Sequence, residues 1–216
     1  MADLKDLTVE GFVQITSSDE PAPGGGSVSA LAGALGAALA EMVARLTTGR
    51  EKYADAEEAM QLVLKEAAQI KEELLLAIQK DSSSFEQYMT ALSMPKSTEE
   101  EKAARRAAMQ DGLKAAAQVP MSVARTAGRI LPLARLAVTQ GNSNAVTDGL
   151  VATMMARTAV LGALFNVRIN LSSIRDEAFT SAMAEEADRL EAEALKGEQE
   201  ILGEAAKLGL YRAALV

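Results

Sequence analysis

The sequence predicts an all-α protein: a multihelical bundle of long up-and-down helices around a buried central helix rich in glycine and alanine. Hydrophobic residues make up 49% of the chain but aromatic residues only 3%, a balance that favours helices over sheets. Apolar residues recur at spacings of three and four, and no segment alternates as a strand would. Without a linker or an internal repeat, residues 1–216 are interpreted as one helical domain.

Composition also limits the chemistry. The net charge of −8 argues against a nucleic-acid partner. The absence of cysteine excludes disulfides and thiolate catalysis, and the absence of histidine removes the commonest general base and the usual zinc sites. We therefore expect no metal and a catalysis that uses carboxylates, lysine, tyrosine or backbone dipoles. No signal peptide is visible in residues 1–6, and the apolar stretch Val28–Ala40 is too short to span a bilayer, so we expect a cytoplasmic protein without a membrane partner.

The first elements follow from residue type. Leu7–Ser17 is predicted as a short amphipathic helix. The segment Pro21–Ser27 is predicted as a loop because two prolines and three consecutive glycines disfavour a helix interior. Ser27 is the expected N-cap of the next helix, which should continue to about Thr48. That helix carries small residues on several faces, which is typical of a buried helix that its neighbours approach closely.

The region Glu51–Met94 contains neither glycine nor proline and is predicted as one long helix ending before Pro95. Its apolar seam, with every step three or four residues, begins at Tyr53 and includes Asp81 at a position that the periodicity reserves for an apolar side chain. Later helices are expected over about 97–118, 120–141 with a kink at Pro132, 145–165 and 176–208. The segment 166–171 is expected to break the helical pattern.

Two interpretations of the glycine loop remain equally open. A glycine-rich loop that leads into a helix N-terminus offers unpaired N–H groups and the positive end of a helix dipole, which suit an anion or a carbonyl oxygen. Alternatively, Gly24, Gly25 and Gly26 only allow a tight turn with positive φ.

Asp81 is the most specific candidate for chemistry. A carboxylate in an apolar seam is costly unless it is paired or used, and burial would raise its pKa toward the value that a general base or acid needs at neutral pH. Ser84 follows on the same helix face. A buried aspartate that pairs with a lysine or a helix N-terminus is the slightly favoured alternative.

Other candidates are weaker one by one. Asp148 begins an apolar helix, where favourable placement near the helix dipole is the more common explanation. Four amides flank that helix and together suggest a lined cleft, although each alone is typical of a cap: Asn142, Asn144, Asn166 and Asn170. Arg45, Arg50 and Lys52 could hold a carboxylate, although solvated charges are commoner.

The segment Pro21–Leu35, with the sequence PAPGGGSVSALAGAL, resembles the signature of the cyclodeaminase/cyclohydrolase family, a folate-processing domain that is fused to formiminotransferase in animals and free-standing in many bacteria. Further matching segments are Leu46–Arg50, Asp81–Phe85, Met94–Lys96, Gly141–Asn144 with Asp148, and Asn166–Leu171. Arg50 stands where a lysine would also fit the pattern. The resemblance covers most of the chain and is weakest in the last helix.

The resemblance implies an all-helical homodimer that binds tetrahydrofolate derivatives without a further cofactor. It leaves two reactions open: hydrolysis of 5,10-methenyltetrahydrofolate to 10-formyltetrahydrofolate, and loss of ammonia from 5-formiminotetrahydrofolate. The sequence leaves no room for a formiminotransferase domain, which favours the cyclohydrolase. A non-catalytic helical binding or assembly protein is a third possibility.

The expected roles combine this resemblance with the chemistry of the residues. Asp81 is expected to be the base, with Asp148 stabilising a cation or relaying a proton. The loop residues Pro23, Gly24, Gly25, Gly26 and Ser27 are expected to hold a substrate oxygen. The four asparagines are expected to bind the pterin edge, with Ser84 and Arg50 as further substrate contacts.

Overall fold

A computed structural model describes residues 3–210. Within that range there is no strand, which confirms the all-α prediction; the outer limits of the predicted domain, residues 1–2 and 211–216, lie outside it. The elements are η1 (Leu4–Asp6), α1 (Val9–Thr16), α2 (Gly25–Arg45), η2 (Glu51–Ala56), α3 (Glu57–Ser93), α4 (Glu99–Gly128), α5 (Ile130–Gln140), η3 (Ser143–Ala145), α6 (Val146–Leu171) and α7 (Glu177–Lys207).

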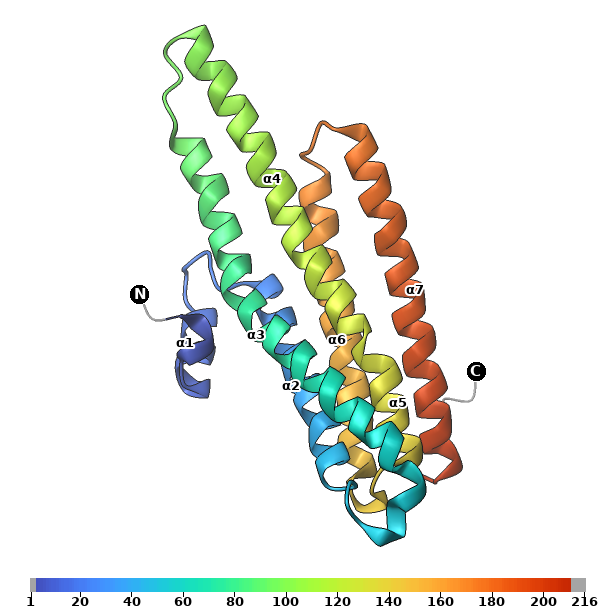
Figure 1. The fold of residues 1–216 in the computed structure, drawn as a ribbon. Coiled ribbons are helices and arrows are strands. Elements are labelled where there is room, and N and C mark those ends of the chain that lie inside the picture. The colour runs from blue at the N-terminus through green and yellow to red at the C-terminus, as the bar shows by residue number, and fades with distance from the viewer. Residues whose placement is uncertain (1–2, 211–216) are drawn as a thin grey trace.

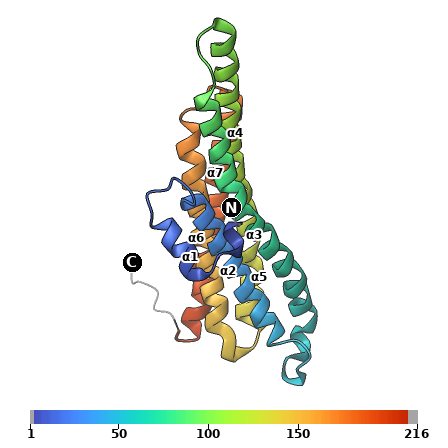
Figure 2. The same ribbon diagram turned by 90° about the vertical axis from the view of Figure 1, so that its left-hand side faces the viewer.

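The long helices run up and down beside one another (Figure 1). Helix α2 packs between α3 and α6, while α4 and α5 close the opposite side of the bundle against the same two helices. Helix α7 packs against α6 on the outside, and the short α1 lies beside α2 and α3 (Figures 1 and 2). Because α2 and α6 are antiparallel, the N-terminus of α2 lies near the C-terminus of α6.

The predicted start of the central helix was wrong. Helix α2 begins at Gly25, and Gly24 rather than Ser27 is its N-cap, so two of the three glycines form its first turn. None of the three has a positive φ, which rules out the tight-turn interpretation. Burial of the helix is confirmed, because a β-carbon added at Gly36 would lie 3.1 Å from the carbonyl oxygen of Ala152 on α6.

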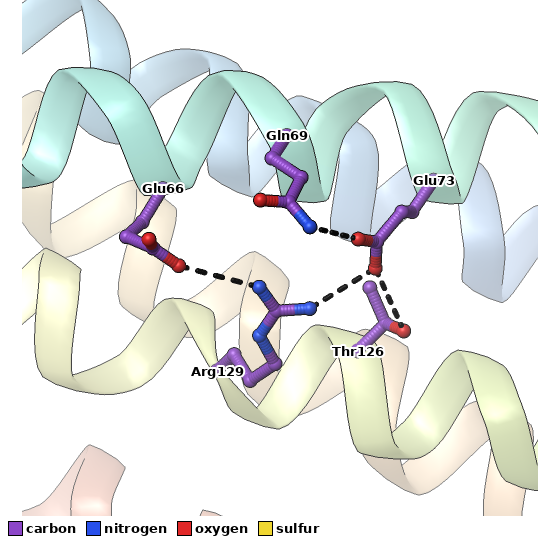
Figure 3. Close-up of polar contacts among 5 residues, drawn as sticks. All are labelled: Glu66, Gln69, Glu73, Thr126 and Arg129. Atoms are coloured by element: carbon purple, nitrogen blue, oxygen red, sulfur yellow. Dashed lines mark hydrogen bonds and ion pairs between the residues drawn. The ribbon is translucent and has the colours of Figure 1, made fainter.

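Helices α3 and α4 also differ from prediction. A short 3-10 helix precedes α3, so 51–94 is not one α-helix, whereas α4 continues through Pro120 without a break. The break comes at Arg129, between α4 and α5, and Pro132 lies in the first turn of α5, where its missing N–H costs little. Arg129 donates to Glu73 at 3.0 Å and to Glu66 at 3.3 Å, which ties the break to α3 (Figure 3).

Helix α6 continues through Leu171, so the expected break at 166–171 was wrong. The polar side chains Asn166 and Asn170 lie on a continuous helix whose buried side carries Ala163, Leu164 and Val167. Helices α2 and α6 are each long and apolar enough to cross a membrane by length and composition, and the apolar part of α2 is longer than Val28–Ala40. Within the bundle 67% of the α2 window is buried, but only 44% of the α6 window.

Candidate active site

Asp81 meets the N-terminus of α2. The side-chain hydroxyl of Ser27 lies 3.1 Å from Oδ2 of Asp81 and 2.9 Å from the carbonyl oxygen of Ile78, so Ser27 ties the start of α2 to α3. A β-carbon added at Gly26 would overlap the Asp81 carboxylate. Glycine at this position therefore allows the carboxylate to lie directly against the first turn of α2, at the positive end of that helix's dipole.

Two opposing effects act on Asp81. Burial raises the pKa of the Asp81 carboxyl, and hydrogen bonds from the hydroxyl and backbone of Ser27 oppose that rise without cancelling it. The net direction is upward, as expected for a carboxylate that no lysine or arginine neutralises. No such cation pairs with Asp81 among residues 3–210. The sequence left two structural partners open for Asp81, a lysine or a helix N-terminus, and the structure places it at a helix N-terminus.

Asn166 and Asn170 face the same cavity from the last turns of α6. The amide nitrogen of Asn166 donates to the carbonyl oxygen of Gly162 at 2.8 Å. The amide nitrogen of Asn170 donates to the carbonyl oxygens of Ala116 at 2.9 Å and Asn166 at 2.8 Å. Since backbone carbonyls use the donor ends, both side chains keep their carbonyl oxygens available as acceptors.

These side chains line a cavity of about 310 Å³ at the junction of α2, α3, α4 and α6. Its lining contains one charged group, the Asp81 carboxylate, and the rest is neutral: Pro21, Ala22, Gly24, Gly25, Gly26, Ser82, Ser84, Phe85, Ala116, Asn166, Ile169 and Asn170. A carboxylate, two fixed amide oxygens and an aromatic ring suit a planar, cationic heterocycle that carries hydrogen-bond donors. Pro23, in the segment before α2, is buried but does not line the cavity.

The other predicted site residues lie at the opposite end of α2. Asn142 donates from its side chain to the carbonyl oxygen of Leu46, just beyond that helix. Asn144 is exposed next to it, Asp148 lies in the first turn of α6, and Arg50 is exposed after α2. Because α2 has 21 residues, it separates the two groups by about 30 Å at ~1.5 Å per residue. Within one chain, Asp148 therefore does not reach the Asp81 cavity.

This second group has its own hydrogen-bond network. The hydroxyl of Tyr53 donates to Oδ1 of Asn142 at 3.1 Å, and the backbone N–H of Ser143 donates to that hydroxyl at 3.3 Å. Hydrogen bonds from Ser143 and then Lys52 lower the pKa of Tyr53 to about 8. Arg50 forms no ion pair with any residue in the described range. The far end of α2 is therefore polar and carries unneutralised cations.

Sequence reasoning missed three of these residues. Ser82 is buried and its hydroxyl lies 3.3 Å from that of Ser27, but it falls one position off the apolar seam. Phe85 was predicted only as a seam residue and as part of a matching segment, and Tyr53 only as a seam residue. The sequence signal for Ser82 was its position next to an aspartate in the seam. Tyr53 had no such signal, because its hydrogen bonds join residues that are far apart in the sequence.

The fold and this cavity define a helical protein with an acidic, acceptor-rich cleft at a helix N-terminus. The family profile described as formiminotransferase-cyclodeaminase matches residues 8–189. The chain therefore belongs to the formiminotransferase-cyclodeaminase family.

Similarity to individual proteins agrees with this assignment. A methenyltetrahydrofolate cyclohydrolase of Methylorubrum extorquens is 37% identical over 187 residues, which cover 87% of this chain and 90% of that protein. A formimidoyltransferase-cyclodeaminase of Gallus gallus is 38% identical over 88% of this chain, but the match spans only 35% of that longer protein. The crystal structure of a formiminotetrahydrofolate cyclodeaminase from Thermotoga maritima superposes with a TM-score of 0.85 at 31% identity, covering 95% of this chain and 99% of that one.

Proposed function

We propose that this protein is a methenyltetrahydrofolate cyclohydrolase, which hydrolyses 5,10-methenyltetrahydrofolate to 10-formyltetrahydrofolate. The observation that carries the proposal is the Asp81 carboxylate, which lies against the first turn of α2. Among the residues that the structure describes, it is the one charge in the cavity lining and has no cationic partner. The methenyl bridge is a cation, so it supplies the missing counter-charge. The 37% identity to the Methylorubrum cyclohydrolase, over 90% of that protein, supports the same reaction.

The chemistry needs a base and then an acid at one place. Asp81 takes a proton from a water that adds to the methenyl carbon, giving a neutral tetrahedral intermediate. The resulting carboxylic acid then protonates N5 as the bond between N5 and that carbon breaks. The remaining hydroxyl proton is lost to solvent as the formyl C=O forms on N10. The raised pKa of Asp81 suits it to both steps, because its acid form persists closer to neutral pH.

Substrate orientation follows from the neutral groups. The carbonyl oxygens of Asn166 and Asn170 would accept from the N–H groups of the pterin, and Phe85 offers a surface for the planar ring. A cavity of about 310 Å³ is large enough for the pterin but not for the whole folate. The benzoyl-glutamate portion would therefore extend out of the cavity.

The cyclodeaminase reaction is the second candidate, favoured by the match to the Thermotoga protein over nearly its whole length. There the leaving ammonia needs a proton, which the acid form of Asp81 could supply. Both activities use the same carboxylate, so substrate preference and not site geometry would separate them.

One experiment separates the candidates. In one assay the purified protein is given 5,10-methenyltetrahydrofolate, and the loss of the methenyl absorbance is measured. In a second assay it is given 5-formiminotetrahydrofolate, and the release of ammonia is measured. We expect fast loss of absorbance over the buffer rate and little ammonia. Ammonia release without methenyl hydrolysis would identify a cyclodeaminase. The absence of both activities would favour a binding protein.

We further propose a cytoplasmic homodimer that works without a metal or added cofactor. Its support is the exposed apolar surface on α2 and α6, because a charge-free surface of that length in water favours a protein partner. Burial of most of α2 within the bundle favours a soluble core helix over a membrane span.

A further inference from the structure

Two buried serines lie beside the Asp81 carboxylate. Ser27 lies in the first turn of α2, and Ser82 follows Asp81 on α3. Their hydroxyl oxygens are 3.3 Å apart, and this contact is the one hydrogen bond of the Ser82 hydroxyl within residues 3–210. Because a buried hydroxyl without a partner is costly, the contact with Ser27 fixes the side chain of Ser82.

The hydroxyl of Ser27 has one proton but two acceptors within reach. Its oxygen lies 2.9 Å from the carbonyl oxygen of Ile78 and 3.1 Å from Oδ2 of Asp81. Ile78 lies inside α3, and its carbonyl oxygen has a second acceptor site besides its helical hydrogen bond. Because the proton of Ser27 goes to one of these two acceptors, the hydroxyl of Ser82 is the donor in its contact with Ser27.

The reaction proposed above uses Asp81 in two protonation states, and each state needs a different partner. A carboxylate accepts hydrogen bonds, whereas a carboxylic acid must also donate its own proton. A backbone N–H serves the carboxylate alone, because it cannot accept. A hydroxyl serves both states, because it donates one hydrogen bond and accepts up to two. The side chain that offers a hydroxyl to the Asp81 carboxylate in the described part of the chain is Ser27.

We propose that Ser27 and Ser82 are positioning residues that let Asp81 act first as a base and then as an acid. While Asp81 is a carboxylate, the O–H of Ser27 donates to its Oδ2. When Asp81 takes a proton from water, the new O–H on Oδ2 donates to Oγ of Ser27, and the O–H of Ser27 turns to the carbonyl oxygen of Ile78. No proton passes between the two side chains, since one O–H group only rotates. Ser82 donates to Oγ of Ser27 in both states and holds that oxygen in place.

The charges around Asp81 leave this role to the hydroxyls. Burial raises the pKa of the Asp81 carboxyl, and hydrogen bonds from Ser27 oppose the rise. Helix α2 has no titratable residue between Gly25 and Ala40. Titratable residues on the elements around Asp81 do not line its cavity: Asp19 and Glu20 before α2, Lys80 and Glu86 on α3, Asp111 and Lys114 on α4, and Arg168 on α6. The catalytic use of the rotation rests on the function proposed above, so the tests include readouts besides turnover.

The first test measures the protonation of Asp81 without substrate. Infrared difference spectra against Asp81→Asn isolate the C=O band of the protonated carboxyl, and the growth of this band on acidification gives a titration midpoint. Ser27→Ala should move the midpoint to higher pH, because the carboxylate loses a donor, and Ser82→Ala should move it less in the same direction. Ser29→Ala is the matched control on α2, because that buried hydroxyl donates to the carbonyl oxygen of Gly25 at 2.6 Å, and its midpoint should stay at the wild-type value. Equal midpoints in wild type and a folded Ser27→Ala variant would overturn the proposal.

The second test follows the rotation itself and uses the absence of native cysteine. Ser27→Cys nearly keeps the shape of the side chain and gives the protein a single S–H stretching band. Over the acidic range in which Asp81 titrates, this band should shift, because the acceptor of the S–H changes from a carboxylate to the carbonyl oxygen of Ile78. The band should not shift in Ser29→Cys, or in Ser27→Cys combined with Asp81→Asn. An S–H band of Ser27→Cys that stays constant while the Asp81 carboxyl band titrates would overturn the rotation, whether or not Ser27→Ala folds.

The third test separates this proposal from the reaction. The acidic limb of the profile of kcat/KM against pH for 5,10-methenyltetrahydrofolate should lie at higher pH in Ser27→Ala than in wild type. Below that limb Ser27→Ala should be slower by about tenfold or more, the effect of losing one hydrogen bond to a charged group, whereas Ser29→Ala should follow wild type. If wild type hydrolyses no substrate but the infrared midpoint and the S–H band shift as expected, the proposed reaction fails and the role of the two hydroxyls stands. An active wild type whose acidic limb coincides with that of Ser27→Ala would overturn the role of the hydroxyls and leave the reaction.

Discussion

The side-chain hydroxyl of Ser27 lies 3.1 Å from the Asp81 carboxylate, and this contact joins the first turn of α2 to the middle of α3. It holds at the start of the buried helix α2 a carboxylate that has no cationic partner within residues 3–210. The same contact explains why the neighbouring residue is glycine, since any side chain at Gly26 would occupy the space of the carboxylate.

Asp81→Asn should lower turnover by about 100-fold or more, the usual scale for a positioned acid–base group. The substitution keeps the shape of the side chain but removes its ability to take a proton. Steady-state rates with 5,10-methenyltetrahydrofolate measure this effect. Near-normal turnover would make Asp81 a structural residue.

The same variant should be more stable than wild type at neutral pH. The pKa of Asp81 is raised above 3.8 in the folded state, so its contribution to stability is fully present below that value and is lost as pH rises through the folded pKa. Asp81→Asn carries no charge and so avoids this loss of stability. Its stability advantage over wild type should therefore shrink as pH falls through the pKa of Asp81 in the folded state. Urea midpoints of both proteins across acidic and neutral pH measure it; an advantage that grows toward low pH would reverse the assigned direction.

Gly26→Ala should reduce turnover far more than Gly25→Ala. The added methyl at Gly26 overlaps the Asp81 carboxylate, which must turn away, whereas at Gly25 it lies 3.2 Å from the amide nitrogen of Asn166 and needs only a small adjustment. The melting temperature should change little, because the displaced carboxylate can turn into the open cavity. Gly128→Ala, where the added carbon meets nothing within 4 Å, is the control. Equal effects of Gly25→Ala and Gly26→Ala on turnover would show that Gly26 does not act on turnover through the Asp81 carboxylate.

Gly36→Ala should destabilise the fold by about 1–3 kcal/mol, the cost of overpacking. Its β-carbon would lie 3.1 Å from a backbone carbonyl of α6, which cannot move without shifting that helix. In contrast, Gly203→Ala on α7 meets nothing and should stabilise by about 0.5–1 kcal/mol through helix propensity. Thermal unfolding of both variants checks the pair. A Gly36→Ala variant as stable as Gly203→Ala would show that α2 and α6 pack more loosely than described.

Tyr53 should make stability depend on alkaline pH. Hydrogen bonds from Ser143 and Lys52 lower its pKa from 10.0 to about 8, so the folded state favours the phenolate. The resulting stability is present above pH 10 and is lost as pH falls through about 8. The stability of wild type relative to Tyr53→Phe should therefore increase between those values. A constant difference, measured by urea unfolding, would mean that the phenol titrates normally.

Periodicity predicted the bundle and the seam well because buried helices must repeat at three or four residues. It placed Asp81 correctly on the buried face of α3. The start of α2 was misjudged because glycine was treated only as a helix breaker. Its lack of a side chain is what lets Asp81 approach the first turn, and that tertiary contact compensates for poor helix propensity.

The extent of α6 was misjudged for a related reason. Asn166 and Asn170 look like breaks in an apolar pattern, but their amide nitrogens donate to backbone carbonyls and both side chains line the cavity. Likewise, no local signal shows that Asn142 lies at the far end of α2 from Asp81. Distances between segments depend on which ends of antiparallel helices meet, and residue spacing along the chain does not contain that information.

The most direct test of the central proposal is the rate of loss of methenyl absorbance from 5,10-methenyltetrahydrofolate with wild-type protein, with Asp81→Asn, and in buffer alone. We predict that wild type greatly exceeds the buffer rate and that Asp81→Asn, with unchanged helical content, is slower than wild type by about 100-fold or more. Wild-type and Asp81→Asn proteins that hydrolyse the substrate equally fast, or a wild type no faster than buffer, would contradict the proposal.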